Sequence, residues 1–267
     1  MNAQIELTAR CNAKCGFCSI WSPEFQKNLE PEMTTEQIKR IIDGLARLGV
    51  MTLSLTGGEP TLRPDLAEIS DYASSKGMMP VMATNGAILK TLLEKGKLDS
   101  MEWIMVSIDY PDAERHDKNR GIEVYDRAVE GIKTAVNMGK IVVVSTVVTN
   151  DNIQHMEEMC ELAQSWGALI ELLPCEDIIR EQEEDAHIVD DVKSFIPDLH
   201  KWADEIRRLK TMYNNITTDN ITASVIEAGG FGNQDLLHCV VAKSFVTIGY
   251  SGDLLLPCKI HPLVKFD

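Results

Sequence analysis

Residues 10–21 read RCNAKCGFCSIW, and this stretch holds three of the seven cysteines in the chain: Cys11, Cys15 and Cys18. A strand-like apolar run, AQIELTA at 3–9, leads directly into it. An odd, unevenly clustered set of cysteines does not suit a disulfide framework, and clustered thiols in a reducing compartment more often bind metal. The stretch therefore predicts a thiolate metal site at the carboxyl end of a strand, in a cytoplasmic protein.

Strand-like and helical patterns alternate after this loop. Apolar runs typical of buried strands lie at 3–9, 50–60, 79–86, 103–109, 140–150 and 168–174. Helical patterns lie between them at 34–48, 64–76, 123–138 and 151–166, with a short helix after 86 and a loop after 109. Six such units, whose strands are apolar on both faces, imply a parallel sheet. The predicted fold is α/β, a partial (β/α)6 TIM-like barrel that six units cannot close.

Residues that can carry chemistry gather at one edge of this predicted sheet. Besides the cysteines, the segment Gly57-Gly58-Glu59-Pro60 and the residues Asn85, Ser107 and Asp109 follow strand ends. In a parallel barrel the carboxyl ends of the strands carry the active-site loops. We therefore expect these residues to share one site. For Asp109, a role in proton handling and an ordinary polar strand end stay equally open.

Composition narrows the class of protein. The chain has 267 residues, 44% hydrophobic and 25% charged, which fits one large domain or one domain with a small appendage. Its net charge of −15 repels phosphate backbones, so nucleic acid is not an expected partner. No apolar run reaches the roughly 18 residues of an integral membrane span, and the N-terminus lacks the layout of a signal peptide.

The pattern changes after residue 174. The acidic segment 175–187 is interpreted as a solvated surface loop, with a substrate-contacting lid as the alternative. A helical pattern over 189–209 is interrupted at Pro197. Two β-like runs then flank Ser251-Gly252-Asp253 and predict a small C-terminal hairpin.

Three thiolates hold a metal differently from four. A structural zinc site generally takes four ligands, commonly as two Cys-x2-Cys pairs, and residues 10–21 supply one such pair. An iron–sulfur cube normally takes four cysteines. With three, one iron stays open to another ligand, which a catalytic cluster needs and a purely electron-carrying cluster does not. The triad therefore favours a catalytic cluster.

The Cys-x3-Cys-x2-Cys triad, with the aromatic Phe17 before its last cysteine, resembles the signature of the radical S-adenosylmethionine (SAM) superfamily. The segment GGEP at 57–60 is similar to that family's methionine-binding turn. The resemblance covers roughly residues 3–174. It implies that the three cysteines are catalytic and ligate three irons of a [4Fe-4S] cluster, whose fourth iron binds the amino and carboxylate groups of SAM.

The same resemblance implies contacts with SAM from the GGEP turn. Gly57 and Gly58 would let the backbone approach the SAM amino group, because no Cβ stands in the way. Glu59 would accept a charge-assisted hydrogen bond from a nearby donor, and Pro60 completes the turn. Phe17 would face the adenine.

Three further positions resemble SAM-binding residues of the family. Asn85, in TNG at 84–86, is similar to the polar member of the third-strand segment that lines the pocket. Ser107 and Arg120 lie in segments that look like those of peptide- and protein-modifying members, where they would hold the SAM carboxylate or ribose. The interval between these two residues is one residue longer than in that family pattern.

The C-terminal segment resembles a second module. We predict a radical SAM core at 1–213 and an auxiliary-cluster-like extension of the twitch or SPASM type at 214–267. The resemblance implies that Cys239 and Cys258 bind an auxiliary iron–sulfur cluster, and unligated cysteines in a structural hairpin are the alternative. Two cysteines are too few to ligate a four-iron cube. Either Cys175 or a noncysteine ligand completes it, or the cluster is absent, or a natural C-terminal portion is missing.

Other candidate ligands have simpler interpretations. Cys160 falls in helical register with apolar neighbours, which is typical of a buried, inert side chain. Cys175 follows a strand end and His238 precedes a cysteine, and ordinary loop positions explain both more simply than a site role does.

The implied chemistry begins with electron transfer from the reduced cluster to the sulfonium of SAM, after which a 5′-deoxyadenosyl radical abstracts hydrogen from the substrate. The protein orients the reactants and excludes water and side reactions. Flavodoxin or ferredoxin is the implied electron donor, and oxygen sensitivity implies an anaerobic or oxygen-guarded host. The hairpin favours a peptide, protein or peptide-derived cofactor as substrate. The alternatives are a radical transferase acting on an isoprenoid lipid or small molecule, and a noncatalytic iron–sulfur or zinc scaffold.

Overall fold

The computed structural model describes residues 1–175, 192–229, 245–255 and 262–265. Its strands form one sheet in the order β6-β5-β4-β3-β2-β1-β7-β8-β9. The strand bounds are β1 Asn2–Thr8, β2 Thr52–Gly57, β3 Met79–Thr84, β4 Trp103–Ser107, β5 Ile141–Val148, β6 Leu169–Pro174, β7 Phe245–Ile248, β8 Asp253–Leu255 and β9 Pro262–Lys265. All six predicted barrel strands are confirmed.

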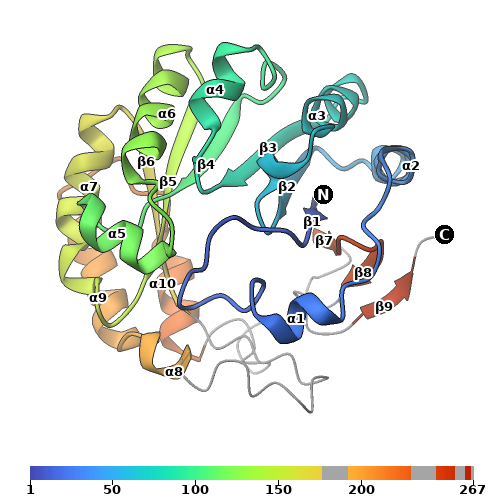
Figure 1. The fold of residues 1–267 in the computed structure, drawn as a ribbon. Coiled ribbons are helices and arrows are strands. Elements are labelled where there is room, and N and C mark those ends of the chain that lie inside the picture. Colours follow the sequence, from blue (N-terminus) through green and yellow to red (C-terminus); the bar gives the residue numbers. More distant parts are fainter. Residues whose placement is uncertain (176–191, 230–244, 256–261, 266–267) are drawn as a thin grey trace.

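Strands β1 to β6 pair with their neighbours in parallel. The order of the strands is linear, with β6 and β9 at its two edges, so the sheet is not closed. The predicted partial barrel is therefore confirmed. Figure 1 shows helices packed around the outside of these strands.

Ten α-helices are present in the described part of the chain. Their bounds are α1 Pro23–Lys27, α2 Thr35–Arg47, α3 Leu66–Ser75, α4 Leu89–Glu94, α5 Ala113–Arg120, α6 Tyr125–Asn137, α7 Met156–Ser165, α8 Val192–Phe195, α9 Leu199–Lys210 and α10 Asn220–Glu227. A capping box opens α2, since the Thr34 side chain accepts from the Gln37 N–H and the Gln37 side chain accepts from the Thr34 N–H. The predicted break at Pro197 separates α8 from α9.

Helix α5 was predicted as a loop, and that prediction is wrong. Its residues have no apolar stripe, so the hydrophobic periodicity that marks a surface helix is missing. The Asp112 side chain caps its N-terminus by accepting from the Arg115 N–H, and Gly121 ends it at a φ of 63°. These two end signals, rather than periodicity, define the helix. Helix α5 matters because it carries Arg120.

The core lies between the sheet and its helices. On β5 and β6 the helix-facing Val144, Ile170 and Leu172 are all 0% exposed. The alternate positions Ser145 and Glu171 face the inside of the barrel and are half-buried. The sheet thus has an apolar outer face and a more accessible inner face.

The predicted C-terminal hairpin is present as β7 and β8, which pair antiparallel across Gly252. Strand β7 also pairs in parallel with β1, from Asn2 with Phe245 to Ile5 with Ile248. The hairpin therefore continues the barrel sheet beyond β1. The division of the chain at residue 213 stays a prediction.

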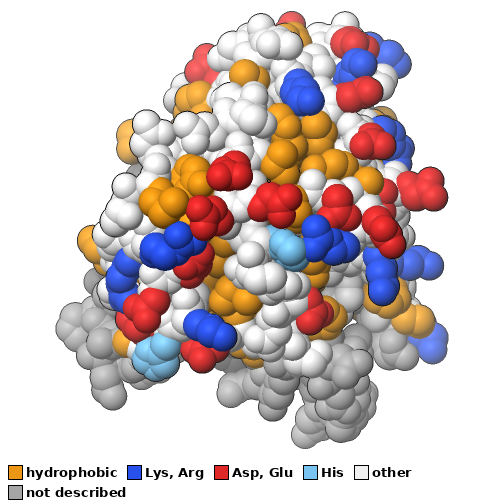
Figure 2. All heavy atoms as spheres, turned by 90° about the vertical axis from the view of Figure 1, so that its left-hand side faces the viewer, with side chains coloured by type: hydrophobic (Ala, Val, Ile, Leu, Met, Phe, Trp, Pro, Cys, Tyr) orange, Lys and Arg blue, Asp and Glu red, His pale blue; other side chains and the backbone are white. Residues whose placement is uncertain are grey.

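In the described residues, no helix is both long and apolar enough to cross a membrane. Figure 2 shows the side that carries α7 and α9, where acidic and basic side chains are interspersed. Arg208 of α9, for example, contacts Glu157 of α7 and Glu205 at 2.6 Å each.

Candidate active site

The cysteine loop, residues 10–21, follows the carboxyl end of β1 as predicted. Cys15 is buried, whereas Cys11 and Cys18 are half-buried, and all three are free thiols. The loop is folded back on itself, because the Cys18 N–H donates to the Cys15 carbonyl at 3.1 Å and the Trp21 indole N–H donates to the same oxygen at 2.9 Å. These contacts hold the last two cysteines of the triad on one turn.

Gly57 and Gly58 lie directly against the entry to the cysteine loop. The Gly58 N–H donates to the Thr8 carbonyl at 2.8 Å, and the Glu59 N–H donates to the Arg10 carbonyl at 2.9 Å. A Cβ on Gly58 would come within 2.2 Å of the Arg10 oxygen, and one on Gly57, whose φ is 134°, within 2.4 Å of the Thr8 oxygen. The glycines are thus required by the close approach of two backbone segments, a reason that the sequence did not suggest.

Glu59 is 1% exposed and joins the ends of two strands. Its Oε1 accepts from the hydroxyls of Thr61 at 2.6 Å and Thr84 at 2.7 Å, and its Oε2 accepts from the Asn85 N–H at 2.8 Å. The Asn85 amide in turn donates to the Asn12 side chain in the cysteine loop at 2.7 Å. Glu59 and Asn85 therefore link β2, β3 and the cysteine loop, and contact of either with SAM stays a prediction.

Asp109 and Arg120 form a buried, bidentate ion pair. The Arg120 Nε donates to Asp109 Oδ2 at 2.6 Å and its Nη2 donates to Oδ1 at 2.8 Å. The Asn119 amide and the Val147 N–H donate to the same carboxylate at 2.8 and 3.0 Å. The two side chains of the pair are 0% and 9% exposed. Asp109 thus fixes the Arg120 guanidinium between β4, β5 and α5.

Arg120 also contacts the cysteine loop from the other side. Its Nη1 lies 3.9 Å from Cys15 Sγ, and its guanidinium carbon lies 5.4 Å from the centre of the Phe17 ring. The Arg120 carbonyl accepts from the Lys14 N–H at 2.9 Å. A side chain at Gly121 would meet the Lys14 carbonyl at 2.8 Å. The carboxyl end of α5 therefore packs directly against the cysteine loop.

Phe195 of α8 is a site residue that the sequence did not single out. Its ring packs edge-on against Phe17 with 6.4 Å between centroids, and a Cβ on Gly16 would lie 3.1 Å from it. The Asn150 N–H, after β5, donates to the Phe195 carbonyl at 3.1 Å. Helix α8 thus covers the side of the cysteine loop that carries Phe17.

The remaining predicted residues have different outcomes. Ser107, at the end of β4, is half-buried, and Pro60 begins a 3-10 turn over Pro60–Leu62. Cys160 is 0% exposed within α7, which agrees with its structural interpretation. Cys175 is buried after β6, and its N–H donates to the Val148 carbonyl at 2.7 Å. The other two predicted metal ligands and their neighbouring histidine lie outside the described residues: Cys239, Cys258 and His238.

The thiols fit an iron–sulfur cluster by their chemistry. Burial raises the pKa of Cys15 to about 11 and raises that of Cys11 as well, so both are neutral thiols in the metal-free chain. A thiol must lose its proton to bind iron, so cluster loading releases protons here. In the part of the chain that the structure describes, no three His, Cys, Asp or Glu side chains are grouped to hold a single metal ion. Soft thiolate donors on one loop suit a cluster.

The model of the Radical SAM superfamily matches residues 5–163, which include the cysteine loop, the GGEP turn and the Asp109–Arg120 pair. This chain belongs to the radical SAM superfamily. The superfamily consists of enzymes whose characteristic cofactors are a [4Fe-4S] cluster and SAM, so the predicted family and cofactors are confirmed at that level.

Curated relatives match the same region. The chain is 36% identical over 166 residues to the AdoMet-dependent heme synthase of Methanosarcina barkeri, a match that covers 61% of this chain and 47% of the relative. It is 36% identical over 177 residues to a probable GTP 3′,8-cyclase of Saccharolobus solfataricus, with 64% of this chain and 56% of the relative covered. The chain therefore spans about half the length of these relatives.

Solved structures share the fold. Streptococcus suis SuiB bound to its precursor peptide SuiA superposes with a TM-score of 0.74 at 16% identity, covering 100% of this chain and 62% of SuiB. Native anSMEcpe with bound AdoMet superposes with a TM-score of 0.69 at 16% identity, covering 99% and 76%. At these identities the likeness shows the radical SAM barrel fold alone.

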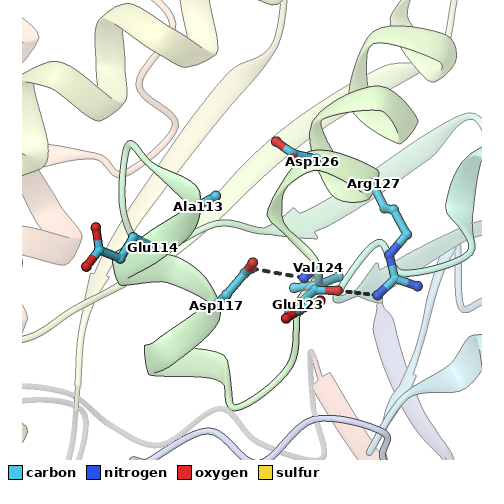
Figure 3. A pocket seen from close by; sticks show the side chains of 7 residues that line it. All are labelled: Ala113, Glu114, Asp117, Glu123, Val124, Asp126 and Arg127. Carbon is cyan, nitrogen blue, oxygen red and sulfur yellow. Dashed lines mark hydrogen bonds between the residues drawn. The ribbon is translucent and has the colours of Figure 1, made fainter.

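A separate hollow lies between α5 and α6 (Figure 3). One of its acidic residues has a local structural role, since Asp117 Oδ1 accepts from the N–H groups of Val124 and Tyr125 at 2.9 Å each and so caps α6. Arg127 of α6 donates to the nearby Glu123 carbonyl. This hollow is a helix junction and carries none of the predicted site residues.

Proposed function

We propose that this chain binds a [4Fe-4S] cluster through Cys11, Cys15 and Cys18 and uses it to cleave SAM reductively. When bound, the cluster and SAM together supply one-electron cleavage of a carbon–sulfur bond and hydrogen abstraction from a substrate. The observation that carries the proposal is the contact of Arg120 with Cys15. A cation fixed 3.9 Å from a ligating sulfur favours the more negative, reduced state of a cluster held there.

The chain's own residues have three tasks in this proposal. Asp109 holds the Arg120 Nε and Nη2 and offsets the cost of burying the guanidinium, so that Nη1 stays directed at Cys15 beside the loop. Glu59 and Asn85 orient the turn that approaches the first cysteine of the triad. Phe195 covers the loop and excludes water from its Phe17 side.

The test is anaerobic reconstitution followed by measurement of 5′-deoxyadenosine formed with dithionite. Wild type should form the product, and the variant with Cys11, Cys15 and Cys18 changed to Ala should form none. Cys160→Ala removes a buried thiol elsewhere and should retain activity. Product formation by the triple variant would contradict the proposal. A zinc-loaded, colourless wild type that forms no product would also contradict it and would favour the scaffold alternative.

Two substrate classes are supported by different observations. The relatives at 36% identity are named for heme and GTP, which favours a small-molecule substrate. The hairpin of β7 and β8 suits the predicted twitch or SPASM extension, which favours a peptide, protein or peptide-derived cofactor. A short precursor peptide encoded beside this gene, consumed with 5′-deoxyadenosine formation, would decide for the peptide class.

We further propose a cytoplasmic, oxygen-guarded location. We also propose that flavodoxin or ferredoxin supplies the electrons. Measuring 5′-deoxyadenosine formation with reduced flavodoxin in place of dithionite tests the electron donor. We also propose an auxiliary cluster at Cys239 and Cys258. Cys239→Ala should lower the iron content while 5′-deoxyadenosine formation in the absence of substrate stays intact.

A further inference from the structure

One row of polar side chains lies on the inner face of the barrel and has no partner among the described residues. Ser107 of β4 is aligned with Ser145 of β5, and Ser145 is aligned with Glu171 of β6. All three are half-buried. In the part of the chain that the structure describes, none of these three side chains forms a hydrogen bond or ion pair. Within residues 1–175 and the other described ranges, the row therefore keeps its hydrogen-bonding groups available for a ligand.

Glu171 is the charged member of the row. Its neighbours Ile170 and Leu172 are 0% exposed against the helices, so strand alternation places Glu171 on the inner face. Burial raises the pKa of its carboxyl group, and among the described residues no neighbouring charge offsets that effect. A partly desolvated carboxylate without a counter-ion is costly to the fold unless a bound cation compensates it.

The charged residues of the inner face indicate whether a positive or a negative group would bind there. Among the inward-facing positions of β1 to β6, the charged residues are Glu6, which has an interaction of its own, and Glu171. None of these positions carries Lys or Arg. The Arg120 guanidinium at the barrel mouth is already paired with Asp109. The inner face thus favours a positively charged group and disfavours an anionic one.

We propose that Glu171 binds a cationic nitrogen of the substrate, an ammonium or guanidinium group, and that Ser145 hydrogen-bonds the atoms beside it. The proposal rests on the proposed function and names its substrate class. Neighbouring strands lie about 4.8 Å apart, so Glu171 sits two strand spacings, about 10 Å, across the sheet from Ser107. Because Ser107 is a predicted SAM contact, this separation places the cation beside SAM and leaves SAM its own position.

Titration calorimetry on the reconstituted full chain with saturating SAM tests the proposal. The probes are n-butylammonium and n-butylguanidinium, with N-butylacetamide as the neutral match. Wild type should bind the cations about 10- to 100-fold more tightly than the amide, as expected for hydrogen bonds to a charged group. Glu171→Gln should bind all three probes equally weakly, and Glu171→Asp should retain part of the preference.

The control is Glu94→Gln, which removes the same charge from an exposed position of α4 and should keep the full preference. Equal binding of cationic and neutral probes by wild type would overturn the proposal, as would a preference that survives in Glu171→Gln. SAM binding is measured in the same samples. Wild type that binds SAM normally but shows no cation preference refutes this inference alone, whereas wild type that does not bind SAM refutes the proposed function. If Glu171→Gln does not fold, an undiminished preference in Glu171→Asp refutes the inference.

Discussion

Replacing Asp109 with Asn should destabilise the metal-free protein strongly. The substitution preserves volume but leaves the buried Arg120 guanidinium facing a neutral amide, whereas the wild-type carboxylate accepts from it at 2.6 and 2.8 Å. Because the two side chains are 0% and 9% exposed, water cannot replace the lost charge. Breaking one side of a buried ion pair costs about 3–5 kcal/mol. Urea unfolding of the full chain, followed by circular dichroism under anaerobic reducing conditions, measures this loss.

Asp112→Asn is the matched control. Asp112 pairs with Arg115, but their side chains are 41% and 43% exposed, and Asn caps a helix as well as Asp does. We expect a loss of under about 1 kcal/mol. Adding Arg120→Met to Asp109→Asn should restore part of the stability, because no buried charge is then left unpaired. Equal small effects of Asp109→Asn and Asp112→Asn would refute the reasoning.

Further predictions concern the cysteine loop, the Phe195 ring that packs on it, and the buried His116. Gly58→Ala should abolish iron binding while the barrel still folds, since the added Cβ would meet the Arg10 carbonyl at 2.2 Å. At Gly44 in α2 the added Cβ would make an ordinary 3.8 Å contact with the Arg47 guanidinium, so Gly44→Ala should raise the unfolding free energy by up to about 1 kcal/mol. Phe195→Ala should expose the loop, so thiol alkylation of the metal-free protein should become faster; an unchanged rate would contradict the packing. Burial lowers the pKa of His116 to about 4, so the unfolded chain binds its proton first and stability falls as pH drops from 6.5 to 4. His116→Gln should reduce that fall by up to about 3 kcal/mol in denaturation curves, and an identical pH slope would contradict the assignment.

The barrel could be predicted because its signals are local. Each strand is an apolar run between turns, and the capping box at Thr34 begins α2 where the sequence places it. Helix α5 escaped prediction because it is polar on all sides, and its two ends, Asp112 and Gly121, were the available signals. The parallel pairing of β7 with β1 joins residues more than two hundred positions apart, which no local pattern specifies.

The sequence pointed to candidate residues for the site, but not to the contacts that the structure shows among them. The triad and the GGEP turn stand out as motifs, and the structure places Arg120 beside Cys15 despite the longer interval before it. The pairing of Arg120 with Asp109 and the cover by Phe195 depend on tertiary packing, so spacing could not reveal them. Likewise, position 58 requires glycine because a neighbouring backbone segment lies too close for a Cβ, and not because a ligand approaches it.

The central claim is that the three thiolates of the cysteine loop hold an iron cube whose open iron binds SAM. Electron paramagnetic resonance of the dithionite-reduced, reconstituted protein, in a background with Cys239 and Cys258 changed to Ala, tests it most directly. We expect about four irons per chain and a signal whose g-values change when SAM is added. An iron-loaded sample with a signal insensitive to SAM, or a signal that persists when Cys11, Cys15 and Cys18 are changed to Ala, would contradict it.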